Sequence, residues 1–293
     1  MRYQVRHATT LEYAAPVASA RFNLRLSPAP CLGQTIGARR LVLSPEPDLR
    51  IEKSGPYCVN TTHIGFSRPI RRLDLESSFD VDIAAPNLPG STPDIAALRA
   101  EALAERDISA VSPAPYLFAS RIAIMDKDIA EWGSAFLSAD QEVLAGARAL
   151  NSAIHREFAY LPGATDSRTG PHEAFRLRKG VCQDFAHVMI SALRANGIPA
   201  AYVSGYLRTE PPPGQKRLIG ADAMHAWVKV WCGSSARWIG FDPTNDCLVR
   251  EDHIQIGMGR DYADVAPIDG TFIGSAPQSM KVAVDVLPSE VAC

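Results

Sequence analysis

Hydrophobic positions after residue 180 recur with the period of a helix that is buried along one side. The apolar residues fall at i, i+3, i+4, i+7 and i+8, namely at Phe185, Val188, Met189, Ala192 and Leu193. Asn196-Gly197 followed by Pro199 is a helix stop, because glycine accepts the left-handed conformation after the last turn and proline cannot continue the hydrogen-bond ladder. The pattern predicts a helix that begins at Cys182 and ends near residue 196.

Two segments further along the chain are predicted strands, the first of them because it alternates with a period of two. Residues 224–231 alternate throughout, and residues 238–242 form a second short strand. Gly233-Ser234 between them suits a two-residue hairpin turn, since glycine is favoured at its first position. This turn would make His225 and Asp242 direct cross-strand neighbours on one face. A slip of one residue would separate them.

The first 83 residues are rich in alternating or β-branched segments that are separated by prolines, which indicates strands. These segments lie near residues 2–13, 20–27, 36–43, 57–64 and 70–83. Two short sheets packed face to face as a sandwich are the simplest way to bury their apolar faces. We therefore expect an all-β N-terminal domain.

A stretch rich in proline and glycine at 85–93 has the composition of a linker, and helical patterns follow it. These helices are expected near residues 94–105, 126–137, 140–158 and 172–178. Asp140 is the expected N-cap of the third one. A strand at 200–207 leads into a proline-rich excursion at 210–214, which we expect to form one rim of a site. Residues 281–287 alternate as a closing strand.

Composition narrows the classes of function. The chain has 293 residues, of which 46% are hydrophobic, enough for a full core and about two domains. The net charge is −2 and no basic run occurs, which argues against nucleic acid or an anionic membrane as a partner. No uncharged segment approaches the ~18 apolar residues of a membrane helix, and the N-terminus lacks the apolar core of a signal peptide. We expect a cytoplasmic protein with no membrane association.

The side chains that bind metals or cofactors lack the spacing that such sites need. Six cysteines are spread too thinly for a disulfide framework, which fits a reducing compartment; they stand at positions 31, 58, 182, 232, 247 and 293. Neither a Cys-x-x-Cys pair nor a His-Glu-x-x-His motif is present, so zinc is not expected. Because no glycine-rich phosphate loop is present, no nucleotide is expected either. The prediction is that the protein uses no cofactor.

Cys182 is the candidate for chemistry, because it stands at the first turn of the predicted helix. Unpaired backbone N–H groups and the positive end of the helix dipole both favour a thiolate there. His225 would face the thiol with one ring nitrogen while Asp242 fixes the tautomer through the other. The alternatives remain open: most free cysteines are small buried hydrophobes, and a lone strand histidine is more often a packed core residue.

Four neighbours of these residues have competing interpretations. The backbone or side-chain N–H of Gln183 could assist at an oxyanion, although the backbone N–H of Cys182 is the safer candidate. Asp184 lies in the first turn, where a carboxylate caps the helix, and it could instead contact substrate. Trp227 is expected in the core or in the wall of the substrate pocket. His187 falls on a different helix face from Cys182 and is expected to be a hydrogen-bonding core residue.

Three blocks resemble the signature of one family. Gly-Val-Cys-Gln-Asp-Phe-Ala-His at 180–187, Asp-Ala-Met-His-Ala-Trp at 222–227 and Gly-Phe-Asp-Pro-Thr-Asn at 240–245 look like those of the bacterial transglutaminase-like family, which belongs to the papain-like superfamily of cysteine enzymes. The first ~85 residues resemble the β-rich domain that precedes the core in this family. The resemblance implies Cys182 as nucleophile, His225 as general base and then acid, and Asp242 as the orienting carboxylate.

The resemblance and the patterns together predict an α+β protein. A papain-like or transglutaminase-like core, with the nucleophile helix packed on an antiparallel sheet, would follow an all-β sandwich-like domain. The expected limits are 1–85 for the β domain, 86–139 for a linker with helices and 140–293 for the core with its C-terminal strand.

The expected activity is thiol-dependent acyl transfer on a peptide or protein amide, with hydrolysis ranked first. Crosslinking or deamidation of glutamine residues is an alternative, and a non-catalytic module that binds peptides is another. The triad alone does not distinguish these outcomes, because they depend on what attacks the thioester. The oligomeric state is not predicted.

Overall fold

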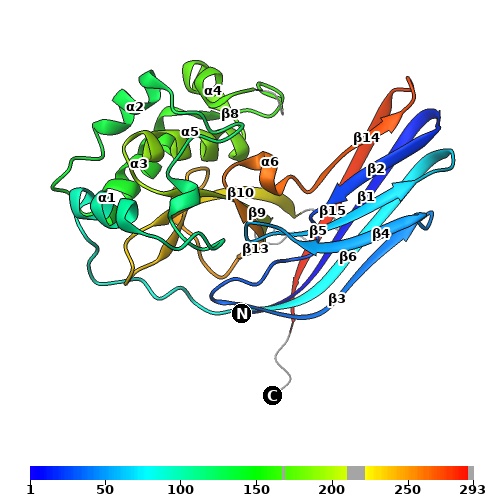
Figure 1. Ribbon diagram of the computed structural model, residues 1–293, viewed down its shortest axis with the longest axis horizontal. Coiled ribbons are helices and arrows are strands. Elements are labelled where there is room, and N and C mark those ends of the chain that lie inside the picture. The colour runs from blue at the N-terminus through cyan, green and yellow to red at the C-terminus, as the bar shows by residue number, and fades with distance from the viewer. Residues whose placement is uncertain (167–168, 210–221, 290–293) are drawn as a thin grey trace, which may run out of the picture.

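The computed structural model describes residues 1–166, 169–209 and 222–289. Figure 1 shows a helical layer, α1 to α5, on one side of a central sheet and two long-stranded sheets on the other side. The rim expected at residues 210–214 lies outside the described residues. None of the described helices is long and apolar enough to cross a membrane.

The N-terminal part forms the expected sandwich of two four-stranded antiparallel sheets, ordered β15-β1-β6-β3 and β14-β2-β5-β4. Its strands are β1 (Arg2–Val17), β2 (Ser19–Leu24), β3 (Gln34–Ser44), β4 (Leu49–Ser54), β5 (Asn60–Phe66), β6 (Ile70–Ile83), β14 (Ile268–Ile273) and β15 (Gln278–Pro288). Strand β1 buries every second side chain over most of its length, as the alternation in its sequence predicts. Apolar side chains of both sheets, including Leu11, Phe22, Ile64 and Leu73, meet in one core.

The last two strands of the chain belong to this sandwich. Strand β15 pairs with β1 from Tyr3 to Tyr13, which confirms the closing strand expected at 281–287, and β14 pairs with β2. Strands β4 and β14 were not predicted. All of β4 is exposed and β14 has no buried residue, so neither has the burial alternation on which the prediction of a strand depends.

The remaining elements form the α+β core. A five-stranded sheet has the order β12-β11-β10-β9-β13, built from β9 (Ala200–Leu207), β10 (Ala223–Trp231), β11 (Trp238–Asp242), β12 (Cys247–Leu248) and β13 (His253–Gly259). The helices are α1 (Ile95–Ala104), α2 (Lys127–Ser134), α3 (Val143–Glu157), α4 (Pro171–Leu177), α5 (Cys182–Ala195) and the short α6 (Tyr262–Val265), with a 3-10 turn at Ala114–Tyr116. A parallel pair, β7 (Ala159–Tyr160) and β8 (Lys179–Gly180), precedes α5. Helix α5 packs on β9 and β10, and α2, α3 and α4 pack against it as well. All its residues from Asp184 to Arg194 are therefore buried, and the expectation of a helix buried along one side only is wrong.

A second expectation about the helices is wrong. Helix α3 begins at Val143 after Glu142, and Asp140 is not its N-cap. The Asp140 carboxylate instead accepts a hydrogen bond from the Ser138 hydroxyl at 2.8 Å. A short polar side chain near a helix start serves an adjacent turn as readily as the helix itself.

One face of the β1 sheet serves two partners. The later residues of β1 on this face point into the core of the sandwich. Tyr3 and Val5 at its start, with Val286 of β15, pack instead against Tyr206 and Ile254 of the α+β core. Buried His7 stands where the two halves meet, and its Nδ1 lies 2.9 Å from the Tyr206 hydroxyl. Burial lowers the pKa of His7 to about 4, so the ring is neutral and hydrogen-bonded. The sandwich therefore packs directly against strand β9 of the core.

Candidate active site

Hydrogen bonds of the Asp184 side chain and the lack of a side chain at Gly180 stabilise the start of helix α5 at Cys182. The Asp184 carboxylate accepts hydrogen bonds from the Val181 N–H at 2.8 Å and from the Thr165 hydroxyl at 2.7 Å. It folds back over Gly180, where a Cβ would lie 2.5 Å from its oxygen, so glycine is required there. Asp184 is 4% exposed, and burial raises its pKa. The capping interpretation of Asp184 thus fits the geometry, and a substrate contact does not.

His225 and Asp242 come together, but by a different register from the one expected. The ladder pairs Val228 with Phe241 and Trp231 with Trp238, two residues away from the predicted pairing. The connection is a longer loop, 232–237, in which Gly233 and Arg237 both have positive φ. Because side chains alternate with a period of two, a shift of two keeps Asp242 on the face of His225 as a diagonal neighbour. His225 Nε2 lies 2.7 Å from Asp242 Oδ2.

The Asp242 carboxylate is fully buried and accepts five hydrogen bonds. Oδ2 receives His225 Nε2 at 2.7 Å, Asn245 Nδ2 at 2.7 Å and His253 Nε2 at 3.1 Å. Oδ1 receives the backbone N–H groups of Thr244 at 3.0 Å and Asn245 at 3.2 Å. Every lone-pair direction of the carboxylate is thus used, and its orientation is fixed.

The electrostatics of the cluster favour a charged histidine. Burial works against the imidazolium, but hydrogen bonds with Asp242 and with the Cys182 thiol outweigh it and raise the pKa of His225 to about 10. Burial also works against the carboxylate, but hydrogen bonds from His225, His253 and Asn245 hold the pKa of Asp242 well below its usual range. At neutral pH the site therefore holds an ionised carboxylate and an imidazolium whose other side meets Cys182.

The remaining candidates lie near the triad in different roles. Trp227 is 1% exposed and contacts both histidines: its ring is tilted against that of His225 at a centroid distance of 6.1 Å and meets His253 edge to face at 5.3 Å. Its side chain belongs to a buried core cluster, and a place in the wall of a substrate pocket stays a prediction. Gln183 is half-buried in the first turn of α5, and its oxyanion role stays a prediction. Burial lowers the pKa of His187 to about 4, consistent with a neutral core residue.

Two residues of the cluster were missed by sequence reasoning. Asn245 had a signal, because Asp-Pro-Thr-Asn is a sequence in which an aspartate accepts N–H groups two and three residues on. His253 had none. It lies on β13, at the opposite edge of the sheet from β12, and its side chain reaches Asp242 across β9 and β10.

Gly205 on β9 makes this approach possible. A Cβ at this position would collide with the carbonyl oxygen of Ile254 and with the Trp227 ring. The absence of a side chain lets the indole lie across β9 and reach His253 on β13.

Gly205→Ala is expected to destabilise the fold by about 1–3 kcal/mol and to slow alkylation of Cys182 by iodoacetamide, because the added methyl group displaces Trp227 and β13. Thermal unfolding and the alkylation rate measure the two effects. Gly90→Ala is the matched control, since a Cβ there meets nothing within 4 Å. Equal melting temperatures for the two variants would contradict this account.

His225, Asp242 and His253 are close enough together to hold a metal ion, but the hydrogen bonds favour a protonated cluster. His253 Nδ1 accepts the backbone N–H of Arg250 at 3.3 Å, so the proton of the neutral ring is on Nε2, which faces Asp242. A metal ion would need Nε2 without its proton, because a histidine nitrogen binds a metal through its lone pair. Binding of an ion here would break the contacts with both Arg250 and Asp242.

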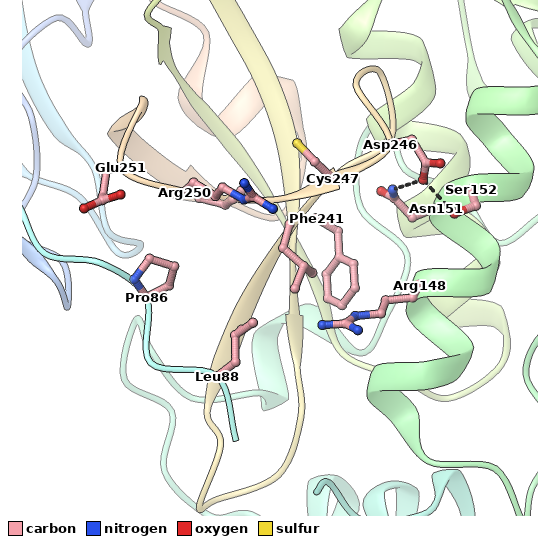
Figure 2. A pocket seen from close by; sticks show the side chains of 12 residues that line it. Pro86, Leu88, Arg148, Asn151, Ser152, Phe241, Asp246, Cys247, Arg250 and Glu251 are labelled. Atoms are coloured by element: carbon pink, nitrogen blue, oxygen red, sulfur yellow. Dashed lines mark hydrogen bonds between the residues drawn. The ribbon is translucent and has the colours of Figure 1, made fainter. Parts of the chain in front are cut away.

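A cavity of about 550 Å³ lies between α3 and the strands β11 and β12, and neither His225 nor Asp242 lines it. Figure 2 shows Arg148 and Arg250 reaching into it beside Phe241, with Asp246 held by Asn151 and Ser152. Cys247, the ladder partner of Asp242, also lines it. Cys182 does not line this cavity; it is partly exposed at the start of α5.

The comparisons with known proteins agree with this fold. A family profile for the transglutaminase-like superfamily matches residues 131–243, and one for the bacterial transglutaminase-like N-terminal region matches residues 3–82. An uncharacterised protein of Mycobacterium tuberculosis is 36% identical over 99% of this chain and 93% of its own length. The chain belongs to the transglutaminase-like superfamily, whose members are typically cysteine proteases or transglutaminases, and the resemblance read from the three blocks is confirmed.

Two further relatives bear on the fold and the chemistry. The crystal structure of a proposed cysteine protease from Cytophaga hutchinsonii superposes with a TM-score of 0.74 at 23% identity, covering 100% of this chain and 92% of that one. It confirms the predicted fold class. A protein-glutamine gamma-glutamyltransferase of Pseudomonas aeruginosa is 34% identical over 43% of this chain, but only 18% of that protein is covered.

Proposed function

We propose that this protein is a thiol-dependent acyl-transfer enzyme that acts on peptide or protein amides, with hydrolysis as its main outcome. The observation that carries the proposal is the chain of contacts from the Cys182 thiol through His225 to Asp242. A nucleophile, a base and an orienting acid in hydrogen-bond reach form the arrangement that nucleophilic catalysis needs. All three come from helices and strands of the core, namely α5, β10 and β11.

The proposed reaction has two steps. The Cys182 thiolate attacks the amide carbonyl carbon, the carbon–nitrogen bond breaks, the His225 imidazolium gives its proton to the departing nitrogen, and a thioester remains. His225 then removes a proton from water, which attacks the thioester and releases the acid and the thiol. The unpaired N–H groups of the first turn of α5 would stabilise the oxyanion in both steps.

Hydrolysis is ranked first because Cys182 is partly exposed, so water can reach a thioester formed there. Crosslinking is the second candidate, supported by the similarity of the core to the Pseudomonas glutamyltransferase. In that case a primary amine replaces water as the attacking group.

The test is incubation of the full chain with glutamine-containing peptides, with and without a primary amine such as methylamine. Mass spectrometry is expected to show chain cleavage for proteolysis or a gain of about one dalton for deamidation. A methylamine adduct would favour crosslinking. The Cys182→Ala variant is the control. Products that form equally with this variant, or no covalent reaction of Cys182 with activated acyl groups, would refute the proposal.

A further inference from the structure

His253 occupies a position that the proposed mechanism does not yet use. Its Nε2 lies 3.1 Å from Asp242 Oδ2, the same oxygen that accepts His225 Nε2. His253 is only 7% exposed, so its ring does not reach bulk solvent or a substrate. It can act on the reaction only through Asp242.

The proton positions of His253 follow from its neighbours. The Arg250 backbone N–H can only donate, so Nδ1, which it contacts at 3.3 Å, is an acceptor and Nε2 carries the proton. Nε2–H therefore donates to Asp242. The two histidines compete as donors for one carboxylate oxygen.

The sandwich and β9 hold His253 in place. Its neighbour Asp252 accepts the Tyr3 hydroxyl and Arg208 Nε, both at 2.7 Å. Tyr3 is fully buried on β1, and His253 itself pairs with Leu207 on β9. Through these contacts the N-terminal domain fixes the start of β13 and thus the donor to Asp242.

We propose that His253 is a positioning residue that divides the hydrogen-bonding capacity of Asp242 and thereby keeps the His225 imidazolium able to release its proton. This role rests on the proposed acyl-transfer function. A carboxylate shared among three donors stabilises each of them less than one devoted to a single donor. A general acid must give up its proton to the leaving amine, so an imidazolium held too tightly is a poor acid.

The other ionisable groups near the cluster do not change charge between pH 5 and 9. Burial raises the pKa of the Cys247 thiol to about 11, and the phenols of Tyr160 and Tyr202 have raised pKa values. Asp252 stays ionised against Arg208.

The test uses His253→Phe, which keeps a ring against Trp227 but removes the donor. Two reactions are compared: acylation of Cys182 by p-nitrophenyl acetate, whose leaving group needs no proton, and turnover of a glutamine peptide amide, whose leaving nitrogen does. The amide reaction is expected to fall about 10-fold, while ester acylation stays within about twofold. Because Asp242 then stabilises the imidazolium–thiolate pair more strongly, the acid midpoint of iodoacetamide alkylation should move to lower pH.

His253→Gln is the rescue variant, because it restores an N–H donor, and it should behave like the wild type in all three assays. Asn245→Ala removes another donor from the same oxygen on an exposed turn and should shift the alkylation midpoint in the same direction, which keeps the proposal testable if His253→Phe does not fold. Equal losses in ester and amide reactions, or an unchanged midpoint in both variants, would overturn the role of His253. Failure of the wild type to acylate would instead overturn the proposed function.

Discussion

Asp242→Asn is expected to lower amide turnover by about 10³ to 10⁴-fold and to destabilise the fold by about 3 kcal/mol. The reason is the saturation of the carboxylate by donors. If the new amide NH₂ takes the place of Oδ2, it faces His225, Asn245 and His253. If it takes the place of Oδ1, it faces two backbone N–H groups. In both orientations the new N–H donor faces groups that also donate, so buried hydrogen bonds are lost and the folded state is destabilised. Steady-state turnover and chemical denaturation measure the two effects.

Asp246→Asn is the matched control, since this carboxylate is on the same turn but is exposed and bonded to Asn151 and Ser152. It should change turnover by less than twofold.

The effect of pH on the stability difference has a definite sign. Because the pKa of Asp242 is depressed, its contribution to stability is present above about pH 4 and is lost as the pH falls through its folded pKa. The stability difference between wild type and Asp242→Asn should shrink in acid. An Asp242→Asn variant that keeps more than a tenth of the wild-type turnover would contradict this role of the carboxylate.

The sequence was sufficient for the local elements of the site. Apolar periodicity placed helix α5, and alternation placed β10, because burial on one face imposes these periods. The hairpin register was wrong by two residues, since Gly233 suggested a tight turn while Arg237 adopts positive φ in a longer loop. The conclusion about His225 and Asp242 survived because an even shift preserves the face of a strand.

The part of the site that could not be predicted depends on contacts between distant elements. His253 joins Asp242 across two strands of the sheet, where Gly205 leaves space for Trp227. The sandwich supports the cluster through Tyr3 and Asp252. These contacts depend on the order of the strands in the sheet and on how the sandwich packs on it, and neither leaves a periodic signal in a single sequence.

Three contacts show why the β domain matters to the chemistry. Tyr3 holds Asp252 beside His253, and the backbone of Val284 and Val286 on β15 bonds Asp222 just before β10. Both strands that supply histidines to the cluster are therefore anchored in the sandwich. A separated core would lose these anchors together, so the catalytic geometry depends on both ends of the chain.

His225→Ala is expected to slow iodoacetamide alkylation of Cys182 about 100-fold at pH 6. In the wild type the pKa of His225 is raised to about 10, so the imidazolium that stabilises a neighbouring thiolate is present at pH 6 and is lost only as the pH rises through about 10. Without it, the thiol must lose its proton to solvent. Hydroxide does this at higher pH, so the rates of the two proteins should converge to within a few-fold near pH 9.

The control is His172→Ala, on the outer helix α4, where the half-exposed ring pairs with Asp126 and not with the cluster. Its alkylation profile should overlay that of the wild type. A His225→Ala profile that also overlays it at pH 6 would mean that the helix terminus alone activates Cys182, and the imidazolium would then have no part in forming the nucleophile. A gap that is wide at pH 6 and closes with rising pH is the signature of an ion pair, because a general loss of structure would slow alkylation at every pH.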